Sequence, residues 1–172
     1  FHASIRPSSR RVIDELNTAG IRSIMLTGDA IDAAITVAST VSLIQTRKVA
    51  ILEFVRDENG NEQLQWNFVE MSSKKGGASR RSTGTKPFTS SSLQAVLKRE
   101  MDGKCAIACT GSVLDVMLTS TSKVHQNFMD NLFRVSVIAR ATPKQKKAVI
   151  SCLRRQCGRS VMMCGTFLLR SL

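Results

Sequence analysis

The tripeptide Thr27-Gly28-Asp29 brings three chemically useful groups to one predicted turn, a place that suits a phosphate. It follows the short apolar run 21–26, which predicts a buried strand, and it precedes a helical pattern that begins near residue 31. A hydroxyl, an unhindered backbone amide and a carboxylate therefore meet at a helix start, where free N–H groups and the helix dipole attract anions. The tripeptide alone is also typical of an ordinary turn in which Asp29 caps the helix.

A second group of candidate residues, Arg140 and Lys146, lies far downstream. Arg140 follows a predicted strand at 135–139, and Pro143 suits the first turn of the helix that comes next. If the strands before Thr27 and Arg140 are parallel neighbours, their carboxyl ends meet at one edge of a sheet. This topology predicts that both groups form one pocket; without it, Lys146 is typical of a solvated helix face.

The elements that must position these residues alternate between short apolar strands and amphipathic helices. The predicted strands are 21–26, 49–55, 64–69, 105–109, 135–139 and 161–164, and the predicted helices begin near Ser8, Ile31, Gly111 and Pro143. The dipeptide Asn59-Gly60 favours a hairpin between the second and third strands. This alternation predicts an α/β fold with a mostly parallel, Rossmann-like sheet flanked by helices.

One segment interrupts this alternation. Residues 72–92 contain five Lys or Arg residues and many Ser and Gly residues, with too little apolar surface to offset the entropy of ordering the chain. The sequence therefore predicts a disordered basic loop at 72–92. The loop would separate two parts of one domain segment, 1–71 with the hairpin and 93–165, and the tail 166–172 is aberrant.

Composition narrows the function classes. The 172 residues suffice for one compact domain, and no apolar run approaches the roughly 20 residues needed to span a bilayer, so we expect a soluble segment. The five cysteines and two histidines include no Cys-x-x-Cys pair, which argues against a zinc site. The net charge of +12 suits a phosphate-rich partner. However, the cations of 72–92 have no interleaved aromatic residues, so nucleic-acid binding is the less favoured hypothesis.

Three segments, in the same order, resemble segments of the P-type ATPases, which belong to the haloacid dehalogenase superfamily. Thr27-Gly28-Asp29 and the helix after it resemble the family's Thr-Gly-Asp segment. Residues 139–146, Ala-Arg-Ala-Thr-Pro-Lys-Gln-Lys, resemble its Ala-Arg-x-x-Pro-x-Gln-Lys segment, and residues 160–165 resemble the strand leading into its hinge. Within the family, the Gln before Lys146 and the sequence Met-Cys-Gly are most similar to type V. The run Arg-Ala-Thr-Pro-Lys-Gln-Lys is most similar to its endoplasmic-reticulum branch.

The resemblance implies a role for each candidate residue. Thr27 would donate a hydrogen bond to the transferred phosphoryl group, and Gly28 would let the backbone approach it closely. Asp29 would organise the same pocket and contribute to nucleotide binding. Lys146 would offset negative charge on the phosphoryl group, and Arg140 would lie near the nucleotide. These electrostatic roles are typical of phosphoryl transfer, which in this family uses ATP and Mg²⁺.

Two departures from the family pattern limit what this chain can do alone. The nucleophilic Asp of the family's Asp-Lys-Thr-Gly-Thr sequence is absent, and Thr83-Gly84-Thr85 only echoes part of that sequence. After Gly165 the chain lacks the Gly-Asp-Gly-x-Asn-Asp hinge, whose carboxylates hold Mg²⁺ in the family. We therefore expect no metal site, no tightly bound ATP or Mg²⁺, and no ATP hydrolysis by this chain alone.

Together these observations favour a truncated fragment of the cytosolic phosphorylation domain of an ATP-driven membrane transporter. The expected partners are ATP or phosphate, bound weakly, and the rest of the parent ATPase: its nucleotide-binding, actuator and membrane domains. The expected location is the cytosolic face of a membrane. The resemblance to the endoplasmic-reticulum branch of type V implies that this membrane is the endoplasmic reticulum. Two alternatives stay open: a catalytically dead phosphate-binding or regulatory remnant, and a basic nucleic-acid-binding module.

Overall fold

The computed structural model describes residues 5–56, 60–74, 77–157 and 160–164. The strands are β1 (Met25–Leu26), β2 (Lys48–Arg56), β3 (Glu62–Lys74), β4 (Gly77–Pro87), β5 (Ala106–Thr110) and β6 (Val135–Ala139). The helices are α1 (Ser9–Thr18), α2 (Ile31–Thr40), α3 (Ser90–Met101), α4 (Gly111–Thr119), α5 (Lys123–Asp130), the 3₁₀ helix η1 (Leu132–Arg134) and α6 (Pro143–Cys157). Within the described part of the chain, every helix is too short or too polar to traverse a lipid bilayer.

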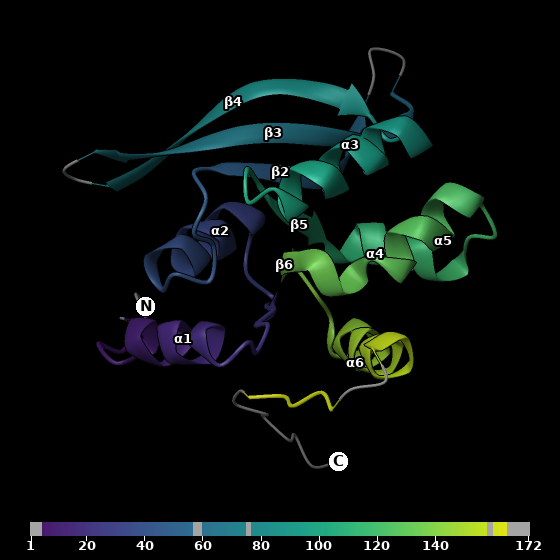
Figure 1. Cartoon of the computed structure of the whole chain (residues 1–172). Coiled ribbons are helices and arrows are strands. Elements are labelled where there is room, and N and C mark those ends of the chain that lie inside the picture. Colours follow the sequence, from purple (N-terminus) through teal and green to yellow (C-terminus); the bar gives the residue numbers. More distant parts are fainter. Residues whose placement is uncertain (1–4, 57–59, 75–76, 158–159, 165–172) are drawn as a thin grey trace, which may run out of the picture.

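The described strands form one sheet in the order β1-β6-β5-β2-β3-β4. β1, β6, β5 and β2 run parallel, and β3 and β4 extend the sheet as an antiparallel ribbon (Figure 1). The prediction of an α/β fold with a mostly parallel sheet is therefore confirmed. Because parallel neighbours end on the same side, the carboxyl ends of β1, β6 and β5 meet at one edge. That edge carries the residues that directly follow each strand: Thr27, Arg140 and Gly111.

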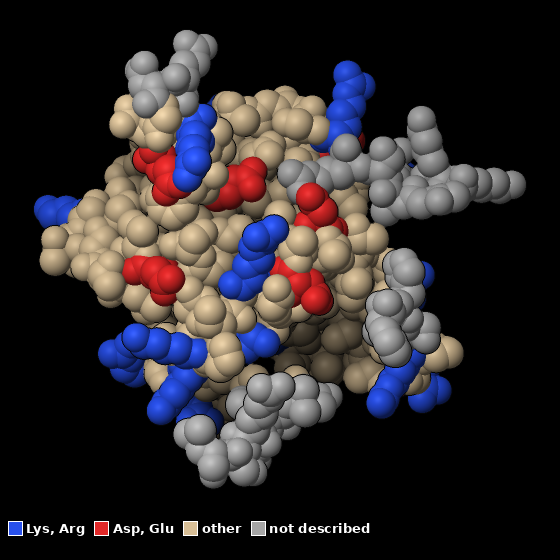
Figure 2. Space-filling model, turned by 180° about the vertical axis from the view of Figure 1, so that it is seen from behind, with Lys and Arg blue, Asp and Glu red and all other residues tan. Residues whose placement is uncertain are grey.

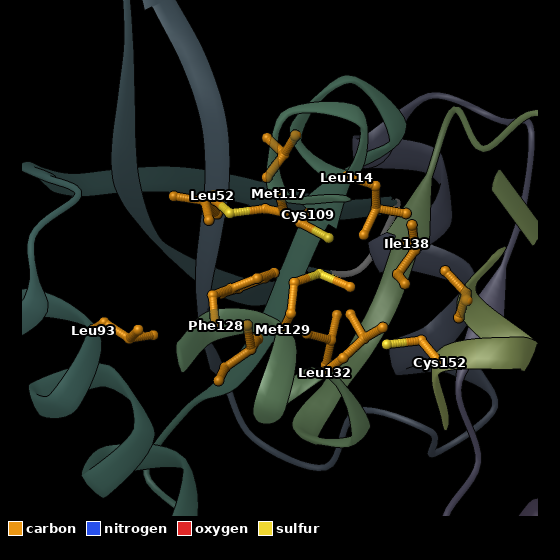
Figure 3. Close-up of a cluster of buried hydrophobic side chains, with 14 of the residues drawn as sticks. Leu52, Leu93, Cys109, Leu114, Met117, Phe128, Met129, Leu132, Ile138 and Cys152 are labelled. Carbon is orange, nitrogen blue, oxygen red and sulfur yellow. The ribbon is translucent and has the colours of Figure 1, made fainter. Parts of the chain in front are cut away.

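Apolar clusters cover both faces of the sheet, because side chains alternate along each strand. In β5, Ile107 and Cys109 belong to the larger cluster, whereas Ala106 and Ala108 belong to the smaller one. Side chains of α2 complete the smaller cluster, and α3, α4, α5 and α6 contribute to the larger one (Figure 1). Figure 3 shows side chains of the larger cluster, with Phe128 and Met129 between Leu93 and Cys152 in this view. Burial on both faces explains the nearly continuous apolar runs of the central parallel strands.

The structure differs from the predicted disordered loop at 72–92. Residues Gly77–Pro87 form β4, which pairs with β3, and α3 begins at Ser90. A polar segment can form a strand because the ladder is made by backbone N–H and C=O groups, which the free edge of β3 supplies. Phe88 follows β4 and packs against the buried Trp66 of β3, with ring centroids 5.9 Å apart. This aromatic contact anchors one end of the ribbon to the core.

Two other predicted strands are corrected. Residues 160–164 carry no strand, since they pair with none of the described strands. The strand predicted at 21–26 is reduced to β1, since only Met25 and Leu26 pair with β6. Residues 57–59 of the predicted hairpin turn and the tail 166–172 lie outside the described residues.

Candidate functional site

The segments that follow β1 and β6 continue to pair beyond the strands themselves. The Thr27 amide donates to the Ile138 carbonyl at 3.0 Å, and the Ala141 amide donates to the Thr27 carbonyl at 2.8 Å. The Arg140 amide donates to the Asp29 carbonyl at 3.0 Å. The two groups of candidate residues, far apart in the sequence, are therefore joined by backbone hydrogen bonds at one edge of the sheet.

The side chains of Thr27 and Asp29 are engaged with each other. The Thr27 hydroxyl donates to the Asp29 carboxylate (Oγ1 to Oδ2, 2.7 Å) and accepts the Asp29 amide at 3.1 Å. Thr27 is half-buried and Asp29 is exposed, so solvent and small anions reach this turn. An anion that takes the Thr27 hydroxyl as its donor must displace the Asp29 carboxylate, which also repels it. Asp29 therefore orders the turn and at the same time competes with an anionic ligand.

Gly28 is not required by the fold itself. A Cβ at this position would meet no atom within 4 Å, and its φ lies outside the left-handed region. Neither packing nor backbone conformation therefore explains a glycine here. The open space leaves room for a ligand beside the backbone of Gly28, as the predicted close approach of a phosphate requires.

The chain turns from β6 into α6 at Arg140, whose φ of 52° is in the left-handed region. A capping box then begins the helix: the Thr142 amide donates to Gln145 Oε1 at 2.7 Å, and the Gln145 amide donates to Thr142 Oγ1 at 3.3 Å. Thr-x-x-Gln is a known signature of a helix start, with Pro143 at the first helical position. The sequence analysis missed this role of Gln145, although its signal was present.

Gln145 also joins α6 to the start of α4. Its side chain is only 6% exposed, and its Nε2 donates to the Gly111 carbonyl at 2.9 Å and to Asp115 Oδ2 at 2.8 Å. A Cβ at Gly111 would lie 2.5 Å from the Arg140 carbonyl oxygen, so the two helix starts meet at a distance that only glycine allows. Gly111 therefore packs against the carbonyl of Arg140, whose amide is bonded to Asp29. No feature of the linear sequence revealed the pairing of Gly111 with Gln145.

Cations gather around α6. Figure 2 shows Lys and Arg side chains clustered at lower left, over the position of α6. Among the described residues, no ion pair neutralises Arg140, Lys144, Lys146 or Lys147. The edge therefore offers net positive charge to an anion. The half-buried Lys146 makes no recorded side-chain contact with the described atoms of Thr27 or Asp29, so its place in the site stays a prediction.

The donor set of this edge suits an anion better than a metal ion. In the described parts of the chain, no group of three or more His, Cys, Asp or Glu side chains is arranged to hold a metal. The turn supplies one carboxylate, Asp29, which is already bonded to Thr27. Mg²⁺ takes an octahedral set of oxygens that one such carboxylate does not provide.

Comparison with known proteins gives two similar chains, both from Mus musculus. The chain is 27% identical over 169 residues to the polyamine-transporting ATPase 13A2 and 25% identical over 174 residues to the probable cation-transporting ATPase 13A4. Each match covers 94% of this chain but 13% of the relative, so the chain spans about an eighth of their length. No family model matches the chain. The similarity supports the predicted relation to the P-type ATPases.

Proposed function

We propose that the chain is a piece of the cytosolic phosphorylation domain of an ATP-driven membrane transporter of the P-type ATPase kind. Its sheet edge would bind the phosphoryl group that the parent protein transfers. The observation that carries the proposal is the pairing of the Thr27–Asp29 turn with Arg140 and Ala141. Similarity to two transport ATPases over 94% of the chain supports it.

Each residue of the edge has a task that its chemistry can perform. The Thr27 hydroxyl and the backbone amide of Gly28 would donate hydrogen bonds to phosphoryl oxygens, and Lys146 and Arg140 would supply positive charge. Fixed donors and cations of this kind stabilise phosphoryl transfer without reacting themselves. Asp29 would hold the Thr27 hydroxyl in place until the anion arrives.

ATP and Mg²⁺ belong to the proposal for the parent protein and not for this chain alone. ATP would supply the phosphoryl group, and an Asp of the parent would accept it. The residues described at this edge lack the oxygen ligands that Mg²⁺ needs, so no step of the reaction is assigned to them beyond anion binding.

The finer placement also forms part of the proposal. Residues 1–71 and 93–165 would be two parts of one haloacid dehalogenase-like domain at the cytosolic face of a membrane. The run 140–146 indicates the endoplasmic-reticulum branch of type V. The relatives' names favour polyamines or other cations as the cargo of the parent protein. The partners would be the nucleotide-binding, actuator and membrane domains of the same protein.

Titration of the ¹⁵N-labelled chain with inorganic phosphate tests the site directly. The largest chemical-shift changes are expected at Thr27, Gly28 and Asp29 and at the first turn of α6. Lys146→Ala is expected to weaken binding about tenfold, since a nearby cation contributes a charge-assisted contact. The matched control is Lys98→Ala, an exposed lysine in the last turn of α3. Changes centred elsewhere, or equal effects of both substitutions, would refute the proposal.

The second hypothesis, a phosphate-binding remnant without turnover, rests on the same edge and predicts the same titration. The two hypotheses differ in what a completed domain can do. Supplying the missing segments of a related ATPase should restore phosphorylation by ATP in the first case and should fail in the second.

A further inference from the structure

A buried carboxylate links the two strands of the site at their other end. Glu100, near the end of α3, has a side chain that is 9% exposed, and both of its oxygens are used. Oε1 accepts Arg22 Nη2 at 2.8 Å, and Oε2 accepts Arg134 Nη1 at 2.9 Å. Arg22 Nη2 also donates to the Arg134 carbonyl at 2.6 Å, which closes a three-residue network.

The network spans the amino ends of β1 and β6. Arg22 lies in the segment that leads into β1, and Arg134 ends η1 and directly precedes β6. These are the two strands whose carboxyl ends carry the Thr27–Asp29 turn and Arg140. Glu100 therefore links β1 and β6 at their amino ends, and the backbone bonds of the site link the same two strands at their carboxyl ends.

β1 needs such a restraint more than any other described strand. It is the outermost described strand at its end of the sheet, and its ladder holds two pairs, Met25↔Val137 and Leu26↔Ile138, which the backbone bonds of Thr27 and Asp29 continue. So short a ladder specifies register weakly, and a slip of one residue would turn every side chain of the strand to the opposite face. The Thr27 hydroxyl would then lie on the opposite side of the sheet.

We propose that Glu100 is a positioning residue for this site: through Arg22 it fixes the register of β1 and so places the Thr27–Asp29 turn beside Arg140 and Ala141. It touches no ligand. Its low exposure separates it from surface pairs such as Arg56–Glu62, whose side chains are 75% and 55% exposed and contribute little. The geometric part of this inference is independent of phosphate binding, and only the affinity readout rests on the proposed function.

The direct test measures hydrogen exchange of the Ala141 amide, which donates to Thr27 at the far end of β1. Arg22→Met frees β1 from the network while the Glu100–Arg134 pair remains, so the variant is expected to stay folded. Glu100→Gln weakens both contacts. Each change is expected to speed Ala141 exchange about tenfold, as local opening becomes more frequent. Glu62→Gln, the same substitution in an exposed ion pair, is the control and is expected to leave the rate unchanged.

A double variant separates positioning from general destabilisation. If Glu100 acts through Arg22, Arg22→Met together with Glu100→Gln should exchange no faster than the faster single variant, because both substitutions act on the same Arg22–Glu100 contact. Unchanged Ala141 exchange in Arg22→Met, or multiplied effects in the double variant, would overturn the inference. Phosphate affinity is measured alongside and should fall with the exchange effect. If the wild-type chain binds no phosphate, the proposed function is refuted. Faster Ala141 exchange in the variants would still support the positioning role of Glu100.

Discussion

Replacing Gly111 by alanine tests the packing that joins α4 to α6. The new Cβ would lie 2.5 Å from the Arg140 carbonyl oxygen and 2.6 Å from Gln145 Oε1, distances that Cβ atoms essentially never show. The Arg140 carbonyl has little freedom, because this residue is held at a φ of 52° and its amide is bonded to Asp29. The Gln145 side chain must therefore give way.

The cost follows from the bonds that Gln145 makes. Its side chain donates to Gly111 and Asp115 and accepts the Thr142 amide. Losing one or two of these buried bonds costs about 1 kcal/mol each, and the residual overpacking adds about 1–3 kcal/mol. We expect Gly111→Ala to lower the free energy of unfolding by about 2–5 kcal/mol, a large share of the 5–15 kcal/mol typical of a domain.

Urea unfolding of the wild-type and variant chains measures this loss as a lower midpoint with an unchanged m-value. Gly28→Ala is the matched control, because a Cβ there meets nothing within 4 Å, and its unfolding free energy should change by less than about 0.5 kcal/mol. The same control variant should still bind phosphate more weakly, since its methyl group intrudes on the anion. A Gly111→Ala variant as stable as the wild type would refute the reasoning, as would a strongly destabilised Gly28→Ala.

Three further outcomes are expected. Asp29→Asn removes the carboxylate that accepts the Thr27 hydroxyl and repels anions, so the affinity for inorganic phosphate should rise about threefold to tenfold. Unchanged affinity would show that Asp29 does not compete for that hydroxyl. Burial raises the pKa of the Cys109 thiol from 9.0 to about 12. As pH rises, this thiol ionises in the unfolded chain before it does in the folded one, so the free energy of unfolding should fall above about pH 9. Urea unfolding at pH 8 and pH 10 should show this decline, and the decline should be shallower in Cys109→Ala. Equal declines in both chains would contradict the prediction. The isolated chain should release phosphate from ATP no faster than buffer does; activity that survives repurification and disappears in Lys146→Ala would show that the missing Asp and hinge are not needed.

The sequence by itself determined the elements that form the site. Short apolar runs located β5 and β6, and apolar periodicity located α2. The tripeptide Thr27-Gly28-Asp29 indicated the turn after β1. Thr142 and Gln145 stand at the spacing of a capping box, which depends only on residues close together in the chain. Such features depend on neighbours in the chain, so the sequence contains them in full.

The tertiary structure decided which distant groups meet. β4 formed from a polar segment because β3 offered a free backbone edge, whereas residues 160–164 pair with no described strand and form none. Gly111 had to be glycine because Arg140 and Gln145 press against it from another helix start. Glu100 became a link between β1 and β6 because folding brought Arg22 and Arg134 to one buried carboxylate. Strand pairing, close packing and buried ion pairs are set by neighbours in space, and no local pattern of residues specifies those neighbours.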